Sequence, residues 1–270
     1  IFGKLGFPEM GAIGAAYATF AARAVEFIAV TVYVFFIDKK LKTRLRDLFS
    51  CGRIYFRDFI RTGLPLVGSG SSWGVAMAVQ TAIIGRLGAA AIGANAIAAP
   101  VFQVVAVLYS STGTASSVLI GKTVGEDDIP RVKVYTKRLQ KMFIVIGLVS
   151  CGLLLLLKNM ILDIYDVSAE TRGLASVFIV ILSITVIGSS YEAPCLCGIV
   201  SGGGDTKFVL FNDIIFMWCM VLPLSVLSAF VFKFPIPVTF FILKSDQITK
   251  CAVAAVKVNR YKWIRTLTHD

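Results

Sequence analysis

The sequence has little of what a soluble enzyme or a metal site requires. Among its 270 residues there is one histidine, His269, and only 16% of the residues are charged. Zinc sites draw on several His and Cys ligands, so no metal site of that kind is expected. The sequence also lacks a nucleophile elbow, paired histidines and a carboxylate pair at catalytic spacing. We therefore expect that the protein is not an enzyme and has no catalytic residues.

A phosphate-binding loop is also absent. Gly121, Lys122 and Thr123 match the end of the nucleotide-binding pattern, but that pattern needs a glycine five residues earlier, where Ser116 stands. An apolar run rather than a strand precedes them. The sequence gives no support to ATP-driven chemistry.

What the sequence has in abundance is long apolar runs. Hydrophobic residues make up 57% of the chain and the mean hydropathy is +0.80. A helix needs about 20 apolar residues to cross a bilayer. Seven blocks approach or exceed this length: Met10–Ile37, Gly63–Leu87, Ile92–Gly121, Met142–Leu157, Gly173–Val200, Phe208–Phe232 and Pro235–Val256. They predict an all-α integral membrane protein with about seven transmembrane helices.

The positive charge is distributed unevenly between the links that join these blocks. Of the 27 Lys and Arg residues, nineteen fall in alternate links beginning with the first one, and five fall in the opposite set. Basic links stay in the cytoplasm, so we expect a multi-pass protein of a prokaryotic cytoplasmic membrane with a cytoplasmic C-terminus. The net charge of +11 is then a feature of topology, and no nucleic-acid partner is expected.

The apolar blocks divide the chain unequally. Residues 1–37 hold one span, 38–62 form a basic amphipathic connector, 63–256 hold six spans, and 257–270 form a basic tail. An odd number of spans leaves the first residues outside the cell with no helix to deliver them. We therefore expect that an N-terminal membrane portion precedes this sequence.

Charged residues inside the spans are the first candidates for a function, because each is costly in hydrocarbon unless it is paired or hydrated. Glu192 is a lone carboxylate two residues before Pro194 and is the main candidate for coupling to an ion. Arg23 and Glu26 lie three residues apart and can neutralise each other, with a structural and a functional role equally open. Asp213 lies near a span end, where an interfacial role is expected.

Other polar groups predict packing or a solute path. Asp246 and Lys250 have the spacing of an ion pair within one helix, which we interpret as structural. The small residues of the second span favour close helix packing. Polar and aromatic side chains that could line a path for organic cations are Trp73, Gln80, Gln103, Tyr109 and Tyr191.

Several strings resemble landmarks of the multidrug and toxic compound extrusion (MATE) family, in order and over nearly the whole chain. They are Gly6–Gly11 followed by Gly14–Thr19, Gly63-Leu64-Pro65 with Trp73, Gly85–Gly88, Leu119–Lys122 with Gly125, Gly198–Phe208, and the closing Lys262–Arg265. The most specific is the glycine-rich structural motif of Gly202, Gly203, Gly204 and Asp205.

This resemblance implies a transporter of twelve helices in two six-helix lobes. Such proteins export organic cations or amphipathic compounds in exchange for H⁺ or Na⁺. Residues 1–37 would be the final helix of the first lobe, and residues 63–256 the second lobe. The implied partners are a small organic solute and the lipid bilayer, with no cofactor besides the coupling ion and a monomeric full-length protein.

The chain also departs from the family pattern. Some sodium-coupled members carry a glutamate one turn after Gly-Leu-Pro, where this chain has no acid and Trp73 stands nearby. Glu192 is close to a family aspartate but out of register, and Ser201 replaces a common arginine. Two alternatives stay open: a flippase for lipid-linked saccharides from the same superfamily, and a non-transporting membrane scaffold.

Overall fold

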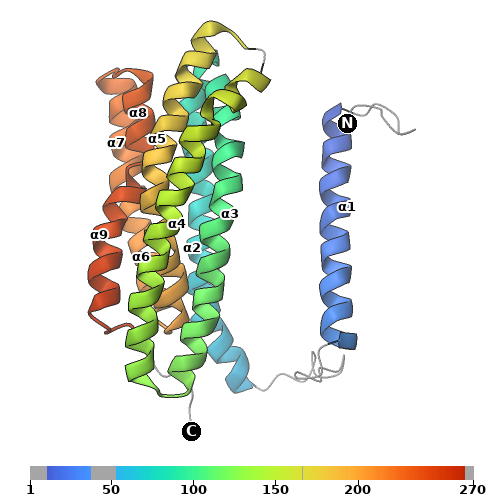
Figure 1. Ribbon diagram of the computed structural model, residues 1–270, viewed down its shortest axis with the longest axis vertical. Helices are drawn as coiled ribbons and strands as arrows, with labels where there is room; N and C mark the ends of the chain where they lie inside the picture. Colours follow the sequence, from blue (N-terminus) through green and yellow to red (C-terminus); the bar gives the residue numbers. More distant parts are fainter. Residues whose placement is uncertain (1–10, 38–52, 166, 265–270) are drawn as a thin grey trace. The chain divides into compact units, whose positions relative to one another are not determined.

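The computed structural model describes residues 11–37, 53–165 and 167–264. Every regular element in these ranges is helical: α1 (Gly11–Val32), η1 (Tyr33–Ile37), α2 (Arg53–Arg86), α3 (Ala89–Gly125), α4 (Ile129–Ile164), α5 (Ala169–Ala193), η3 (Pro194–Val200), α6 (Thr206–Ile214), η4 (Ile215–Val221), α7 (Leu222–Val226), η5 (Leu227–Val231), α8 (Ile236–Leu243) and α9 (Asp246–Asn259). Those labelled η are π-helical. The all-α prediction is confirmed (Figure 1).

The chain divides into two compact units, Ile1–Asp58 and Phe59–Asp270. The first unit contains α1 and η1, and the second contains a bundle of antiparallel helices. In the bundle, α5 packs against α3, α4 and α9, and α3 also packs against α4 and η3 (Figure 1). The turn between α3 and α4 lies at the same end of the bundle as the end of α9 (Figure 1).

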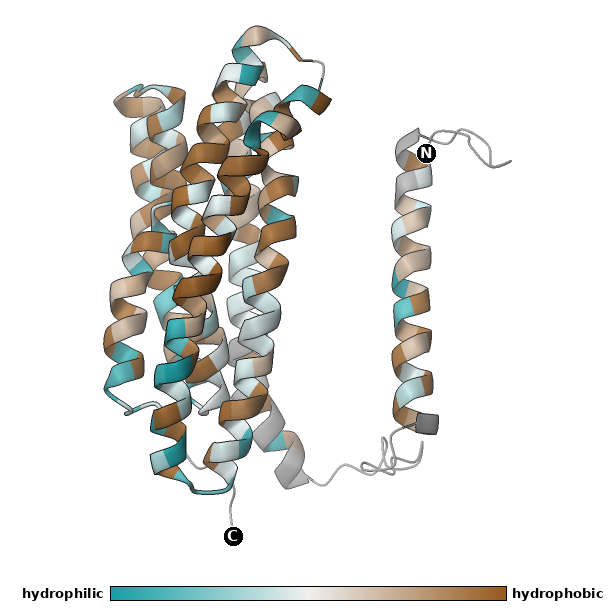
Figure 2. Ribbon diagram, in the orientation of Figure 1, coloured by the Kyte–Doolittle hydropathy of each residue, from teal (hydrophilic) through white to brown (hydrophobic). Residues whose placement is uncertain are grey.

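Five helical segments are long and apolar enough to cross a membrane. They are Ala16–Phe35, Ala89–Gly125, Ile129–Ile164, Ala169–Val200 and Thr206–Val231. The middle of α4 is mainly hydrophobic and its lower end is hydrophilic (Figure 2). The predicted spans Gly63–Leu87 and Pro235–Val256 are helical but do not meet this standard. The first is rich in small and polar residues, and the second is broken into α8 and α9.

Helix starts follow from local capping. The Asp128 carboxylate accepts a hydrogen bond of 3.0 Å from the backbone N–H of Arg131 at the start of α4. At the start of α5 the Ser168 hydroxyl accepts one of 3.3 Å from the N–H of Thr171. These side chains satisfy backbone donors that the first helical turn leaves free. Helix α2 begins at Arg53, within the expected 38–62 connector, and runs to Arg86.

The core of the bundle has two main apolar clusters. One includes Ile97, Phe178 and Phe240, and lies toward the α2–α3 turn. The other includes Phe143 and Trp263 and lies toward the end of α9. Buried polar and charged side chains, Lys250 among them, belong to neither cluster. Glu192 of α5, Asp213 of α6 and Lys250 of α9 lie between members of the two clusters along the chain.

Candidate functional site

A cavity of about 560 Å³ lies within the bundle of the second unit. Side chains from α2, α3, α5, η3, α6, α8 and α9 line it, together with Lys244 of the link between the last two helices. Five charged residues contribute to the lining: Glu192, Asp213, Lys244, Asp246 and Lys250. Charges at this depth of an apolar bundle are costly unless they are paired or hydrated, so the cavity is the main candidate for a functional site.

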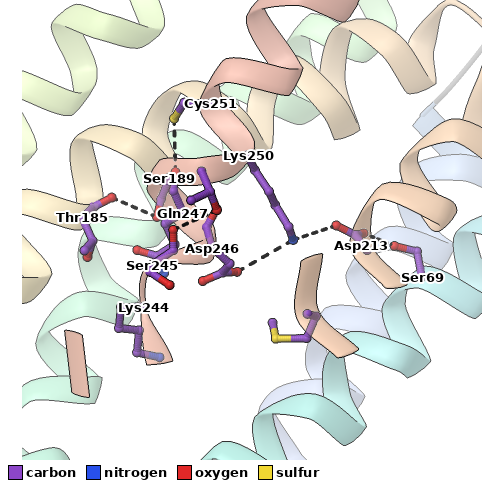
Figure 3. Close-up of polar contacts among 12 residues, drawn as sticks. Ser69, Thr185, Ser189, Asp213, Lys244, Ser245, Asp246, Gln247, Lys250 and Cys251 are labelled. Atoms are coloured by element: carbon purple, nitrogen blue, oxygen red, sulfur yellow. Dashed lines mark hydrogen bonds and ion pairs between the residues drawn. The ribbon is translucent and has the colours of Figure 1, made fainter. Parts of the chain in front are cut away.

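Lys250 joins two helices through an ion-pair network. Its Nζ lies 3.0 Å from Oδ1 of Asp213 on α6 and 3.8 Å from Oδ2 of Asp246 one turn earlier on α9. The hydroxyl of Ser69 on α2 donates a hydrogen bond to the other oxygen of Asp213. Figure 3 shows the ammonium group pointing between the two carboxylates. The Lys250 side chain is only 4% exposed, and ion pairing offsets part of the cost of burying its charge.

A break in the last membrane segment positions this network. After α8 the backbone makes tight three-residue turns, with Lys244 N–H donating to Phe241 O and Ser245 N–H to Ile242 O, both at 3.1 Å. Helix α9 then restarts at Asp246, which places a carboxylate in its first turn, where the helix dipole favours an acid. Lys250 lies about 14 Å from the end of α9 by helix rise.

Glu192 lies one residue before the C-terminal end of α5, where the helix changes at Pro194 to the π-helical segment η3. The proline has no N–H to donate, and π-helical turns inside helices occur often at functional sites. The Glu192 side chain lines the cavity. Its carboxylate makes no hydrogen bond or ion pair with any residue that the structure describes. It is therefore available to a ligand.

Lys244 occupies a different position from Lys250. Its ammonium group donates a hydrogen bond of 3.2 Å to Oε1 of Gln80 and lies 6.0 Å from the ring centre of Phe240. Gln80 is buried and also donates to the sulfur of Met217 at 3.4 Å. Among the described residues, Lys244 forms no ion pair.

Only some of the residues that the sequence suggested for a solute path line the cavity. Trp73, Gln103 and Tyr109 line the cavity. Gln80 and Tyr191 are not part of the lining. Tyr191 instead donates a hydrogen bond of 2.8 Å to Gln140 on α4.

The ion-coupling candidates are also divided. Glu192 and Asp213 both line the cavity, and Asp213 lies beside Lys250. Arg23 and Glu26 form an exposed ion pair of 2.7 Å on α1, in the other unit.

Sequence reasoning missed the role of Lys250 as a link between helices. It paired Lys250 with Asp246 alone, whereas the shorter contact is with Asp213, 37 residues away in the sequence. The signal that could have found it was the presence of two lysines, Lys244 and Lys250, within one apolar span.

The glycine-rich motif forms a second, separate contact region at the end of the bundle. The ring of Trp263 lies directly against Gly203, and its indole N–H donates a hydrogen bond of 2.9 Å to the carbonyl of Val258. The Lys257 ammonium lies 2.7 Å from Asp205 and 4.0 Å from the ring centre of Phe208. The motif therefore holds the segment that follows α9 against the start of α6.

A bundle of long apolar helices with a charged cavity and an interrupted helix beside it is the architecture of a membrane transporter. The MatE family model matches residues 71–227, more than half of the chain, and the chain belongs to this family. Its members are transport proteins.

Known relatives and structures agree with this assignment. A probable multidrug resistance protein NorM of Photorhabdus laumondii is 30% identical over 85% of this chain and 50% of its own length. The uncharacterized transporter YisQ of Bacillus subtilis is 24% identical over 84% of this chain and 50% of its own length. The chain spans about half the length of the curated relatives it matches.

Solved structures support the fold. A crystal structure of MATE in the straight conformation matches with a TM-score of 0.78 and 17% identity, over 93% of this chain and 57% of that one. A MOP superfamily transporter from Pyrococcus furiosus, whose binding pocket is described as having reverse polarity, matches with a TM-score of 0.70 and 15% identity, over 77% of this chain and 46% of that one.

Proposed function

We propose that this chain is the C-terminal part of a secondary active exporter that moves small organic cations or amphipathic compounds out of the cell in exchange for H⁺ or Na⁺. The observation that carries the proposal is the cavity of about 560 Å³ with an unpaired carboxylate, Glu192, in its lining. The names of the NorM relatives, which are multidrug resistance proteins, support the same activity.

The cavity has the chemistry that such a solute requires. Trp73 and Tyr109 offer aromatic faces, which attract organic cations, and Glu192 offers a negative charge. A carboxylate in a low-dielectric cavity attracts a cation far more strongly than it would in water. A proton or Na⁺ at Glu192 removes that attraction, so the ion and a cationic solute exclude each other.

Exchange of ion and solute becomes transport if the two occupants favour different openings of the cavity. An ion can shift a conformational equilibrium only by its difference in affinity for the two states. We propose that occupancy of Glu192 biases the bundle between an outward and an inward opening. The excess of basic residues in alternate links supports a cytoplasmic C-terminus in a prokaryotic cytoplasmic membrane.

The test uses the full-length protein reconstituted in lipid vesicles. A fluorescent organic cation is loaded inside, a proton or a sodium gradient is imposed, and its efflux is followed. We expect gradient-dependent efflux that collapses when an ionophore dissipates the gradient. Efflux equal to that of protein-free vesicles under both gradients would refute the proposal. Movement of a lipid-linked saccharide analogue without cation efflux would support the flippase alternative, and movement of neither would support a scaffold.

A further inference from the structure

The charges in the cavity nearly cancel. Its lining holds three carboxylates, Glu192, Asp213 and Asp246, against the two ammonium groups of Lys244 and Lys250. With all five groups ionised, one negative charge is left without compensation. A low-dielectric cavity admits a charged ligand mainly when the ligand completes this balance.

Lys250 occupies the place that an external cation would take between two of these carboxylates. Its ammonium lies 3.0 Å from Asp213 and 3.8 Å from Asp246, and its side chain is 4% exposed. The Ser69 hydroxyl, on the opposite side of Asp213, completes the carboxylate's partners (Figure 3). The two carboxylates therefore already have a cation, which is attached to α9 and cannot diffuse away.

Acceptor groups among the lining residues remain without such a partner. The Glu192 carboxylate has no ion pair or hydrogen bond within the described residues. The side-chain oxygen of Gln247, next to Asp246 in the first turn of α9, is buried and accepts no hydrogen bond in the same part of the chain. A carboxylate without a partner in a low-dielectric cavity favours a ligand that supplies positive charge, so Glu192 is the group that such a ligand would meet.

We infer that Lys250 is a specificity-determining residue that acts as an internal cation. It occupies the Asp213–Asp246 pair and thereby restricts the cavity to one ligand with a single positive charge, held by Glu192. This rests on the proposed function of the cavity as the solute site. Without the Lys250 ammonium, the cavity carries a second uncompensated negative charge and accepts dications.

The test is equilibrium binding to the purified full-length protein in detergent, without any gradient. The probes are tetraphenylphosphonium, with one positive charge, and methyl viologen, with two. The measured quantity is the ratio of their dissociation constants. An added unit charge about 8 Å away, at an effective dielectric constant of about 20, changes the affinity for each ligand charge by about tenfold to thirtyfold.

We expect the wild-type protein to prefer the monocation by about tenfold or more. Lys250→Met should shift the ratio toward the dication by about tenfold or more, whereas Lys250→Arg, which keeps the charge, should not. The double variant Asp246→Asn with Lys250→Met restores the charge balance and should restore the wild-type ratio. Lys137→Met removes an exposed lysine on α4 and should leave the ratio unchanged.

A monodisperse Lys250→Met protein with an unchanged ratio would overturn the inference, as would a wild-type protein that binds methyl viologen as tightly as tetraphenylphosphonium or binds neither. If Lys250→Met does not fold, the single variant Asp246→Asn tests the inference. It should weaken binding of the dication more than binding of the monocation, and an unchanged ratio of dissociation constants overturns the inference. A wild-type protein that shows the expected binding but no vesicle efflux would refute the proposed function and leave this inference intact.

Discussion

Cε3 and Cζ3 of the Trp263 indole ring lie directly against Gly203, so that no side chain could stand at that position. A methyl group built on Gly203 would overlap Cε3 and Cζ3 of the ring. Trp263 is fully buried, and Gly203 comes from the link before α6, 60 residues earlier in the chain. This contact couples the segment after α9 to the rest of the bundle.

Gly203→Ala should destabilise the bundle by forcing the indole ring out of its site. Overpacking of this kind costs about 1–3 kcal/mol, which corresponds to a fall of several degrees in melting temperature. Thermal unfolding of the purified protein in detergent measures it. Gly74→Ala is the matched control, since an added Cβ on this helical glycine meets nothing within 4 Å. Equal melting temperatures for the two variants would contradict the packing argument.

Glu192→Gln should weaken ion-driven efflux by about tenfold or more, because the amide keeps the shape of the side chain but cannot hold a cation by charge. Efflux from vesicles under a proton and a sodium gradient is the measurement. Glu126→Gln, which changes an exposed carboxylate at the end of α3, is the control. Unchanged efflux and unchanged dependence on the gradient would remove Glu192 from the site.

Much of the fold could be predicted from the sequence, because the length and apolar character that a membrane-spanning helix needs are local properties of the sequence. Hydrocarbon selects runs of apolar residues of a given length, and the helices follow those runs. Pairs on one helix could be predicted for the same reason. Arg23 with Glu26 and Asp246 with Lys250 are set by helical periodicity, and both pairs are present in the structure.

The rest depends on how the helices pack. The contact between Lys250 and Asp213 joins α9 to α6, and no periodicity relates two different helices. The break at Lys244 and Ser245 was also not predicted, since no glycine or proline marks it. The cavity that gathers Glu192 and Trp73 exists only once the seven helical segments that line it are assembled.

Asp213→Asn and Lys250→Met should each destabilise the bundle, because each leaves a buried charge without its main partner. Breaking a buried ion pair from one side costs about 3–5 kcal/mol, whereas removing both charges costs far less. The double variant should therefore be more stable than either single variant. Unfolding in mixed detergent gives the coupling free energy of this double-mutant cycle.

The exposed pair of Lys122 and Glu126 is the control cycle for that experiment. Their charged atoms lie 3.9 Å apart, and the two side chains are 75% and 48% exposed. Water screens such a pair, so its coupling free energy should be only about 0–1 kcal/mol. Similar couplings for the two pairs would mean that Lys250 and Asp213 do not depend on each other for stability.

Trp73→Ala and Tyr191→Phe should separate the residues that contact the solute from those that support the bundle. Trp73 lines the cavity, and loss of its ring removes a cation–π contact of about 1–2 kcal/mol from an aromatic cation. The apparent KM for efflux should rise by about tenfold. Tyr191→Phe breaks the hydrogen bond to Gln140 outside the cavity and should leave KM unchanged. A rise in KM for Tyr191→Phe with none for Trp73→Ala would place the solute elsewhere in the protein.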